Sequence, residues 1–388
     1  MGRPNWSRLV WLACGLGLFW SAAARGEEAD LETKKIMAEI VESLHVVFPL
    51  SLDGTQFSDS ENRAVVDAAL NRLASNAKRL EGHGTNQDVG FAYLSGSLER
   101  YSLDIRERFS EGRVDEARFL LRHLTDTCVA CHSRLPDGQK HSLGKRLTED
   151  SAIAALPREE RVQFEVATRQ FDRALATYES LFTDASVSIA ELDLSGNLES
   201  YLEICLRVQE DPGRAIANLK KLAARKDLPS RLQPRLNSWI EALRSLEEAS
   251  AKNAIEKARA LVEPVLQDSR VSGNSELVRL IAASGLLHRY VTSTSDSAEQ
   301  VGEAYYLLGV IESRVGRSFW ASQTEFFLET AVRMGPKQDY ADDAFALLEE
   351  FLVSGYTGSS GTHVPPDVVK RLEELDELMK RARSAGSS

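Results

Sequence analysis

Two cysteines and a histidine stand at a spacing that can do chemistry. Cys128 and Cys131 are followed at once by His132 in the stretch "TDTCVACHSRLP". On a helix, residues three and four apart share a face, so the three side chains project from nearly the same side. C-x-x-C-H is also the attachment signature of haem c, in which the thiols bond to the porphyrin and the imidazole coordinates the iron. We therefore predict one covalent haem c on Cys128 and Cys131, with His132 as the proximal ligand.

Three other interpretations of the motif explain less. A disulfide between Cys128 and Cys131 suits an oxidising compartment but gives His132 no role. A structural zinc site needs a fourth ligand, and the sequence has no second C-x-x-C and no H-x-x-x-H to supply one. A thioredoxin-like redox site would lie beside a βαβ pattern, which does not surround this motif.

The N-terminus predicts export. Residues 1–24 combine Arg3 and Arg8 with an apolar run and the small residues Ala22, Ala23 and Ala24, which is typical of a signal peptide. The apolar run is roughly 12 residues long, too short for a helix that spans a bilayer. We expect a periplasmic protein without a membrane span.

Composition limits the classes of partner and activity. The chain has 58 acidic and 47 basic residues, a net charge of −11, and four cysteines in 388 residues. Such a chain is neither a disulfide scaffold nor a nucleic-acid binder, and its redox partner is expected to present a basic docking patch. The sequence shows no acid/base or nucleophilic constellation, so we predict that the protein is not an enzyme.

Helical periodicity predicts the elements that position the motif. Apolar residues recur at steps of three and four in four series between residues 31 and 136. The series run from Met37 to Phe48, from Val66 to Leu80, from Phe91 to Phe109 and from Val114 to Cys131. Short connections between helices of similar length favour an antiparallel four-helix bundle. The cysteines continue the buried stripe of the fourth helix, which would aim a haem into the bundle.

Met37 is the candidate distal ligand. In an up-down-up-down bundle the first helix begins beside the end of the fourth, which brings Met37 towards His132. His45 lies about 12 Å further along the first helix, and His123 is about half a turn out of phase with His132. The alternative is that Met37 only packs in the core, which would leave one side of the iron open.

Residues 31–136 resemble the cytochrome c′ and cytochrome c-556 group. The resemblance rests on the position of the motif near the end of the last helix and on Met37 in the first helix. It implies a haem attached outside the cytoplasm, with either a methionine ligand as in c-556 or an open iron side as in cytochrome c′. Those relatives normally stop soon after the motif, whereas this chain continues for some 250 residues.

The rest of the chain also has a helical pattern. We expect a linker at 137–156, a second helical domain at 157–248 and a tetratricopeptide-like region at 251–384. The second domain is interpreted as a duplicate without the haem motif, because "LSGNLESY" at 194–201 matches "LSGSLERY" at 94–101. The third is indicated by "AYYLLGVIESRVG" followed by Ala331 and Pro336, and repeats of this kind stack and offer docking surfaces.

Five further residues lie outside the predicted haem attachment, and four of them are given structural roles. Cys205 aligns with Ile105 in the duplication and is expected in the core, and His141, His288 and His363 are expected at the surface. Arg134 is placed to pair with a haem propionate, with a solvated arginine as the equal alternative.

These observations predict an all-α protein with a haem-carrying four-helix bundle followed by a helical-repeat region. Its expected function is electron transfer to or from a protein partner that docks on the repeat region. The alternatives are a small-gas-binding protein similar to cytochrome c′, and a helical scaffold in which the haem is structural.

Overall fold

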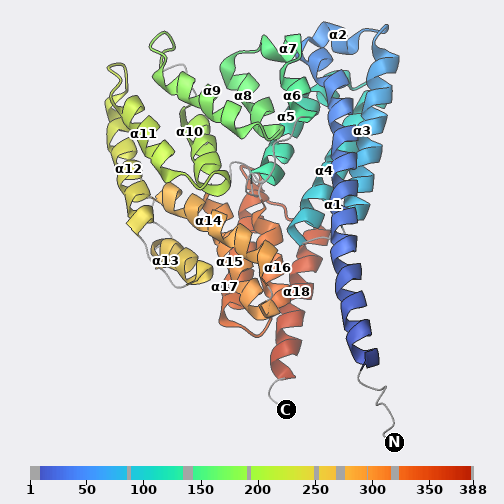
Figure 1. Cartoon of the computed structure of the whole chain (residues 1–388), viewed down its shortest axis with the longest axis vertical. Helices are drawn as coiled ribbons and strands as arrows, with labels where there is room; N and C mark the ends of the chain where they lie inside the picture. Colours follow the sequence, from blue (N-terminus) through green and yellow to red (C-terminus); the bar gives the residue numbers. More distant parts are fainter. Residues whose placement is uncertain are drawn as a thin grey trace, which may run out of the picture. The chain divides into compact units, whose positions relative to one another are not determined.

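The protein is built almost entirely of helices, which confirms the all-α prediction (Figure 1). The structure, a computed structural model, describes residues 9–84, 89–133, 143–189, 194–248, 253–267, 276–294, 296–315 and 323–385. Within these ranges the only strands are β1 (Thr357–Gly358) and β2 (Gly361–Thr362), which pair as a small antiparallel hairpin. The chain divides into two compact units, Met1–Leu124 with Glu149–Ala154, and Thr125–Thr148 with Ala155–Ser388.

Long helices form the first unit. They are α1 (Leu9–Leu52), α3 (Arg63–Gly84), α4 (Val89–Ser110) and the first part of α5 (Val114–His132), with the short helices α2 (Gly54–Ser58) and α7 (Ser151–Ala154). Helix α3 packs against both α1 and α4. The apolar stripe that the sequence predicts on α3 is fully buried, and its members are Val66, Leu70, Leu73, Ala77 and Leu80.

The buried stripe of α1 differs from the prediction by one position at its start. Ile36 and Ile40 are the buried residues there, and they continue into Leu44 and Val47. Met37 is half-buried at the edge of this stripe. Both sets of residues recur at helical spacing, so periodicity alone does not choose between them.

The connection between the first two long helices is more ordered than the sequence indicates. Helix α1 continues to Leu52, and Asp53 then caps α2 by accepting hydrogen bonds from the backbone N–H groups of Thr55 and Gln56 at 2.8 and 3.4 Å. Phe57 of α2 is buried and meets the Phe109 ring edge-on at 5.5 Å.

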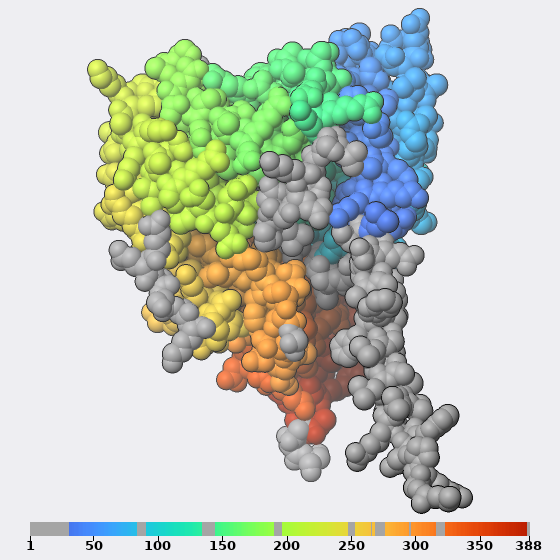
Figure 2. Space-filling model, viewed as in Figure 1, coloured from blue at the N-terminus to red at the C-terminus, as the bar shows by residue number. Residues whose placement is uncertain are grey.

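The second unit begins at Thr125 in the last part of α5, and continues with α6 (Leu143–Thr148) and then with α8 to α12. These are α8 (Arg158–Ala167), α9 (Phe171–Thr183), α10 (Leu194–Glu203) with its π-helical end η2 (Ile204–Val208), α11 (Pro212–Ala223), η3 (Ser230–Leu232) and α12 (Gln233–Glu248). Helix α8 packs on α9, α9 on α11 and α11 on α12. Their side chains form a continuous surface, green to yellow in Figure 2.

Two short helices occupy the segment predicted as a linker. Residues 137–156 contain α6 and α7, because each of these helices buries one apolar side chain in its own unit, Leu147 and Ile153 respectively. The sequence signal for them is weak, since the surrounding residues are polar.

Equivalent positions of the predicted duplication have similar burial. Leu98 and Leu198 are both buried, as are Ile105 and Cys205, so the expectation that Cys205 lies in the core is confirmed. The two helices end differently, because α4 remains α-helical to Ser110 whereas α10 widens into η2. The duplication itself stays a prediction.

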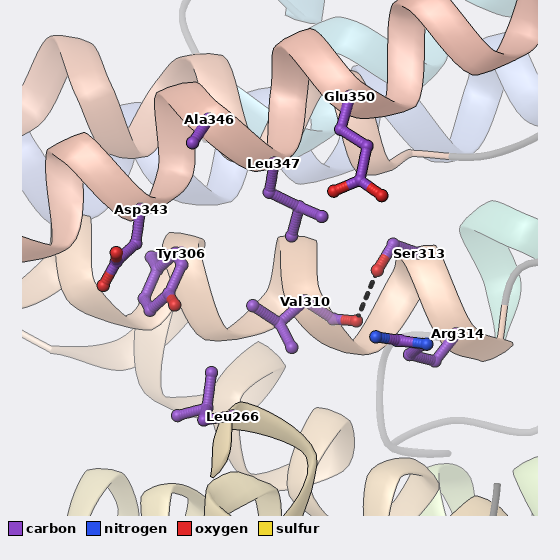
Figure 3. Close-up of a pocket in the computed structure, with 9 residues that line it drawn as sticks. All are labelled: Leu266, Tyr306, Val310, Ser313, Arg314, Asp343, Ala346, Leu347 and Glu350. Atoms are coloured by element: carbon purple, nitrogen blue, oxygen red, sulfur yellow. Dashed lines mark hydrogen bonds between the residues drawn. The ribbon is translucent and has the colours of Figure 1, made fainter. Parts of the chain in front are cut away.

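The last helices follow one another as packed hairpins. They are α13 (Ala254–Gln267), α14 (Glu276–Ser293), α15 (Ala298–Val315), α16 (Thr324–Met334), α17 (Asp339–Gly355) and α18 (Pro366–Ser384). Each packs on the next, and α13, α15 and α17 also meet one another in turn. These three helices line a pocket of about 390 Å³ (Figure 3).

Close packing in this region explains one glycine and overturns one prediction. A Cβ on Gly309 of α15 would lie 2.4 Å from Leu328 Cδ2 of α16, so only glycine allows the two helices to approach this closely. His288, expected at the surface, is only 4 % exposed. Its ring packs 5.9 Å from that of Phe327 because α14 lies between neighbouring helices.

Candidate functional site

The three motif residues lie together in the last two turns of α5. This helix ends at His132, where the backbone N–H of Ser133 still donates to the Val129 carbonyl at 2.9 Å. Cys128, Cys131 and His132 are all half-buried, in contrast to Leu121 and Leu124 earlier on the same stripe, which are fully buried. The segment therefore carries its reactive groups at the edge of the apolar stripe and not inside it.

The Cys128 thiol is not activated as a nucleophile. Neither Cys128 nor Cys131 forms a disulfide. Burial raises the pKa of the Cys128 thiol to about 12, and the charges of Cys131 and Asp126 add to this rise. A redox-active cysteine instead needs a lowered pKa and a populated thiolate. The environment of Cys128 therefore does not favour disulfide-exchange chemistry.

His132 is held in a defined tautomer. Its Nδ1 atom lies 2.6 Å from the backbone carbonyl oxygen of Ala167. A carbonyl oxygen only accepts hydrogen bonds, so Nδ1 must carry the ring proton and donate it. In the neutral imidazole Nε2 then carries the lone pair, which is the arrangement that metal-ligating histidines adopt.

The conformation at the end of α8 leaves the Ala167 carbonyl available to accept a hydrogen bond from outside the helix. The backbone N–H of Arg169 donates to the Val166 carbonyl at 2.9 Å and that of Gln170 donates to the Glu165 carbonyl at 2.8 Å. These two bonds form a Schellman motif, which satisfies the carbonyls of Glu165 and Val166 in the last turn of α8. The carbonyl of Ala167, the final helical residue, accepts its hydrogen bond from the His132 ring.

The two helix ends stabilise each other reciprocally. Arg169 has φ of 59°, the left-handed conformation that the Schellman motif requires and that glycine usually supplies. Its guanidinium packs over the Phe171 ring at 5.5 Å, and its Nη1 atom donates to the His132 carbonyl at 3.4 Å. The end of α5 thus receives a cation from the same turn that accepts its histidine, which also favours the negative end of the helix dipole.

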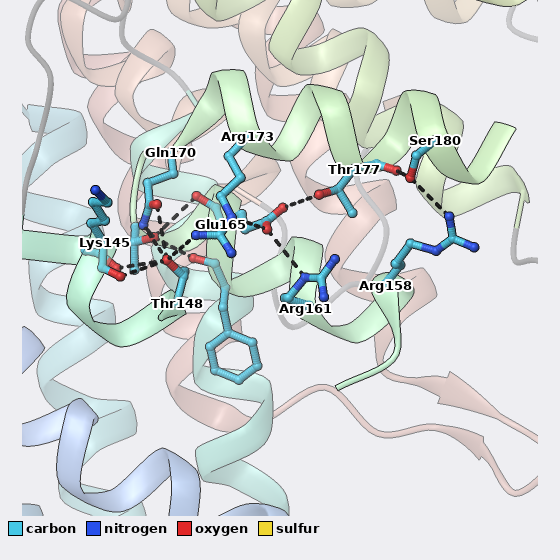
Figure 4. Close-up of polar contacts among 12 residues, drawn as sticks. Lys145, Thr148, Arg158, Arg161, Glu165, Gln170, Arg173, Thr177 and Ser180 are labelled. Carbon is cyan, nitrogen blue, oxygen red and sulfur yellow. Dashed lines mark hydrogen bonds and ion pairs between the residues drawn. The ribbon is translucent and has the colours of Figure 1, made fainter. Parts of the chain in front are cut away.

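A buried carboxylate fixes the hairpin that contains this turn. Glu165 is fully buried, accepts a hydrogen bond from Thr177 Oγ1 at 2.7 Å, and pairs with Arg173 at 2.9 Å (Figure 4). Gln170 donates to the hydroxyl groups of Thr148 and Thr168, both at 2.9 Å. These contacts hold α8, α9 and α6 together, so the position of the Ala167 carbonyl does not depend on α5 alone.

The motif is recognisable in the sequence, but the atom that accepts the hydrogen bond from His132 is not. This acceptor is the backbone carbonyl of Ala167, 35 residues further along the chain. No pattern of side chains predicts which backbone atom will lie there. The break between α8 and α9 has no sequence signal, because Phe164, Ala167 and Phe171 keep helical spacing through "VATRQF", which contains no glycine or proline. Arg169, the residue that makes the turn, was not singled out.

The predicted distal ligand belongs to the other unit. Met37 is half-buried on α1, in the unit that ends at Leu124, whereas His132 lies in the unit that begins at Thr125. Its role as a ligand stays a prediction. Of the other histidines, His123 is exposed, as its phase on the helix indicates, and His363 is exposed as expected. Arg134 and His141 lie outside the described residues.

Two further findings concern the described residues only. In this part of the chain, no group of three or more His, Cys, Asp or Glu side chains is arranged to hold a metal ion. No helix within the same ranges is long and apolar enough to cross a membrane, as the sequence predicts.

Comparison with protein-family models, with curated proteins and with solved structures gives no match to this chain.

Proposed function

We propose that this chain is an exported c-type cytochrome that transfers electrons. In this proposal Cys128 and Cys131 hold one haem covalently and His132 binds its iron through Nε2. A haem held in this way supplies a one-electron couple whose potential depends on the axial ligands and their hydrogen bonds.

The observation that carries the proposal is the hydrogen bond from His132 Nδ1 to the Ala167 carbonyl. It leaves Nε2 as the coordinating atom, and a ligand that donates through its other nitrogen is both oriented and more basic. The same bond also joins the ends of α5 and α8, so the ligand role rests on this tautomer together with the neighbouring Cys128 and Cys131. The half-buried thiols of Cys128 and Cys131 on the same helix supply the two attachment points that the motif requires.

The surroundings of the site suit a carrier of electrons more than a catalyst. Burial keeps the Cys128 thiol protonated, so it does not offer a nucleophile before attachment. We further propose that residues 31–136 form the haem-carrying four-helix bundle, as in the cytochrome c′ and c-556 group, that residues 1–24 direct the chain to the periplasm, and that helices α13 to α18 are tetratricopeptide-like repeats.

A haem-attachment experiment tests this function. The full chain is expressed for export in a host that matures c-type cytochromes, and the purified protein is assayed by the pyridine haemochrome method. We expect one haem that resists extraction by acidified organic solvent. The variant with both Cys128→Ala and Cys131→Ala should lack covalent haem, whereas the matched control Cys205→Ala should keep it. Colourless wild-type protein would contradict the proposal.

A further inference from the structure

The pocket on α13, α15 and α17 is separate from the haem motif. It has a volume of about 390 Å³, within the range of pockets that bind ligands. Leu347 of α17 and Val310 of α15 point towards one another at its centre, and Leu266 of α13 closes it from below (Figure 3). Because the three helices come from successive hairpins, the pocket exists only when the hairpins are stacked.

The floor of the pocket is apolar and partly open to solvent. Leu266 is 38 % exposed, one of few large apolar side chains with so much free surface in the described part of the chain. Ala346 is also exposed, and Tyr306 and Leu347 are half-buried. Covering these atoms would remove apolar surface from water, which is the main driving force for association.

The rim of the pocket is predominantly acidic. Asp343 and Glu350 stand seven residues apart on α17, so they share the face that borders the pocket. Neither forms an ion pair with any residue in the described ranges, whereas the neighbouring Asp342 pairs with Arg383 at 2.6 Å. Burial, with the nearby charge of Asp343, raises the pKa of Tyr306 to about 12.

The pocket also contains one cation. Arg314 lines the end of the pocket near Glu350, opposite the Asp343 end (Figure 3). The lining therefore has two carboxylates against one guanidinium, and its charge has the same sign as that of the whole chain. A second copy of this acidic chain would meet like charge here, which disfavours self-association through the pocket.

We propose that this pocket binds a segment of a partner protein in which an apolar side chain is flanked by lysine or arginine. The apolar side chain would cover Leu266, Val310 and Leu347, and the flanking cations would reach Asp343 and Glu350. This binding site goes beyond the proposed function and gives the region from α13 to α18 a partner of defined chemistry. It does not depend on the haem, since none of these residues lies in the motif.

Peptide binding by the full exported chain tests this inference. The probes are fluorescein-labelled 12-residue peptides with a central leucine or phenylalanine that is flanked on both sides by lysine, by glutamine or by glutamate. Fluorescence anisotropy should show the tightest binding for lysine flanks and the weakest for glutamate flanks, with the preference reduced by salt. No binding by the lysine series, or equal binding by all three, overturns the proposal.

Matched variants locate the binding. Glu350→Lys should weaken binding of the lysine-flanked peptides by about fivefold or more, because it replaces an attractive exposed charge pair with a repulsive one. The control Glu349→Lys changes the same charge at an exposed position that does not line the pocket, and should leave affinity within about twofold. Arg314→Gln should strengthen binding. Equal effects of the two lysine variants overturn the assignment of the pocket.

The outcome is distinguishable from failure of the haem proposal. The same titrations are repeated on the variant with both Cys128→Ala and Cys131→Ala, which carries no attachment site. We expect unchanged peptide affinity, because the binding residues lie on other helices. Peptide binding without haem would support the pocket alone, and covalent haem without peptide binding would overturn the pocket alone.

Discussion

At the scale of single residues, the imidazole of His132 has two nitrogens with separate tasks. Nδ1 donates to a carbonyl oxygen at 2.6 Å, so the electronic character of Nε2 is set by a partner in a different helix. A short hydrogen bond of this kind makes the imidazole a stronger donor to iron and fixes the plane of its ring. The reduction potential of the proposed haem is therefore expected to respond to changes in α8 as well as in α5.

The sixth coordination position can be tested at Met37. If Met37 ligates the iron, the ferric wild-type protein shows the methionine-to-iron charge-transfer band, and Met37→Ala abolishes that band and yields high-spin iron that binds carbon monoxide. The matched control is Val41→Ala, which shortens a half-buried side chain one turn further along the same helix. A wild-type protein that already lacks the band and binds carbon monoxide would favour the gas-binding alternative.

Thiol counting tests the assignment of the cysteines. Once Cys128 and Cys131 carry haem and the predicted signal peptide is removed, Cys205 is the remaining thiol. Burial raises the pKa of Cys205 to about 12, above its ordinary value of 9.0, so at pH 8 the thiol stays protonated. Native protein should therefore not react with Ellman's reagent.

In denaturant we expect one reactive thiol per chain, measured by absorbance. Three reactive thiols would mean that no haem is attached, and a fast reaction of the native protein would contradict the burial of Cys205. The pH dependence has a definite sign, because the folded protein favours the neutral thiol. The contribution of Cys205 to stability is complete below pH 9 and is lost as the pH rises towards about 12.

At the scale of elements, the turn between α8 and α9 carries a conformation that most residues avoid. Arg169 has φ of 59°, which costs a residue with a Cβ roughly 1–2 kcal/mol. Natural turns of this type usually place glycine there. The arginine is compensated by its contacts with the Phe171 ring and the His132 carbonyl.

Two substitutions at Arg169 separate the backbone from the side chain. Arg169→Gly and Arg169→Val both remove the guanidinium, but only valine is strained at this φ. Chemical denaturation should show Arg169→Val less stable than Arg169→Gly by about 1–2 kcal/mol. Equal free energies of unfolding would mean that the left-handed conformation does not limit stability. Both variants should shift the reduction potential in the same direction, since both lose the cation beside His132.

Most of the helices could be predicted, because apolar residues recur at steps of three and four along them. The buried stripe of α3 matches the sequence pattern residue by residue. The stripe of α1 was displaced by one position because Ile36 and Met37 are both apolar and both fit a helical period. Helices α6 and α7 were missed because they are only six and four residues long, too short for a periodic pattern to show.

The part of the site that depends on local side-chain spacing could be predicted, and the part that depends on tertiary contacts could not. Cys128, Cys131 and His132 are recognisable because their chemistry is in their side chains and their spacing is local. The Ala167 carbonyl is a backbone atom brought close by tertiary structure, and every residue has such an atom. The burial of His288 was missed for a related reason, since only the packing of α14 between its neighbours decides it.

At the scale of the whole molecule, charge is expected to govern encounter with a redox partner. The chain carries a net charge of −11, and long-range attraction to a basic partner raises the rate of association. The electron-transfer rate with a small basic redox protein, followed by stopped-flow absorbance, should fall about tenfold or more between 0.01 and 0.15 M salt, as the screening length shrinks from about 30 to about 8 Å.

An uncharged small-molecule oxidant provides the control for this measurement. Its rate should change little over the same range of salt, because it has no charge to be screened. A rate with the basic protein that stays constant or increases with salt would show that the acidic surface does not direct docking.

The hydrogen bond between His132 and Ala167 also has a consequence for how the protein is made. If the chain is exported from its N-terminus as proposed, Cys128 and Cys131 would reach the maturation machinery before α8, when the imidazole of His132 has no carbonyl to orient it. Pigment should therefore attach even to a version truncated after residue 136, but its histidine would rotate freely and its redox couple would be poorly defined. In the proposed cytochrome the downstream hairpin would complete the surroundings of the iron after haem attachment, so the final reduction potential would be acquired late in biogenesis.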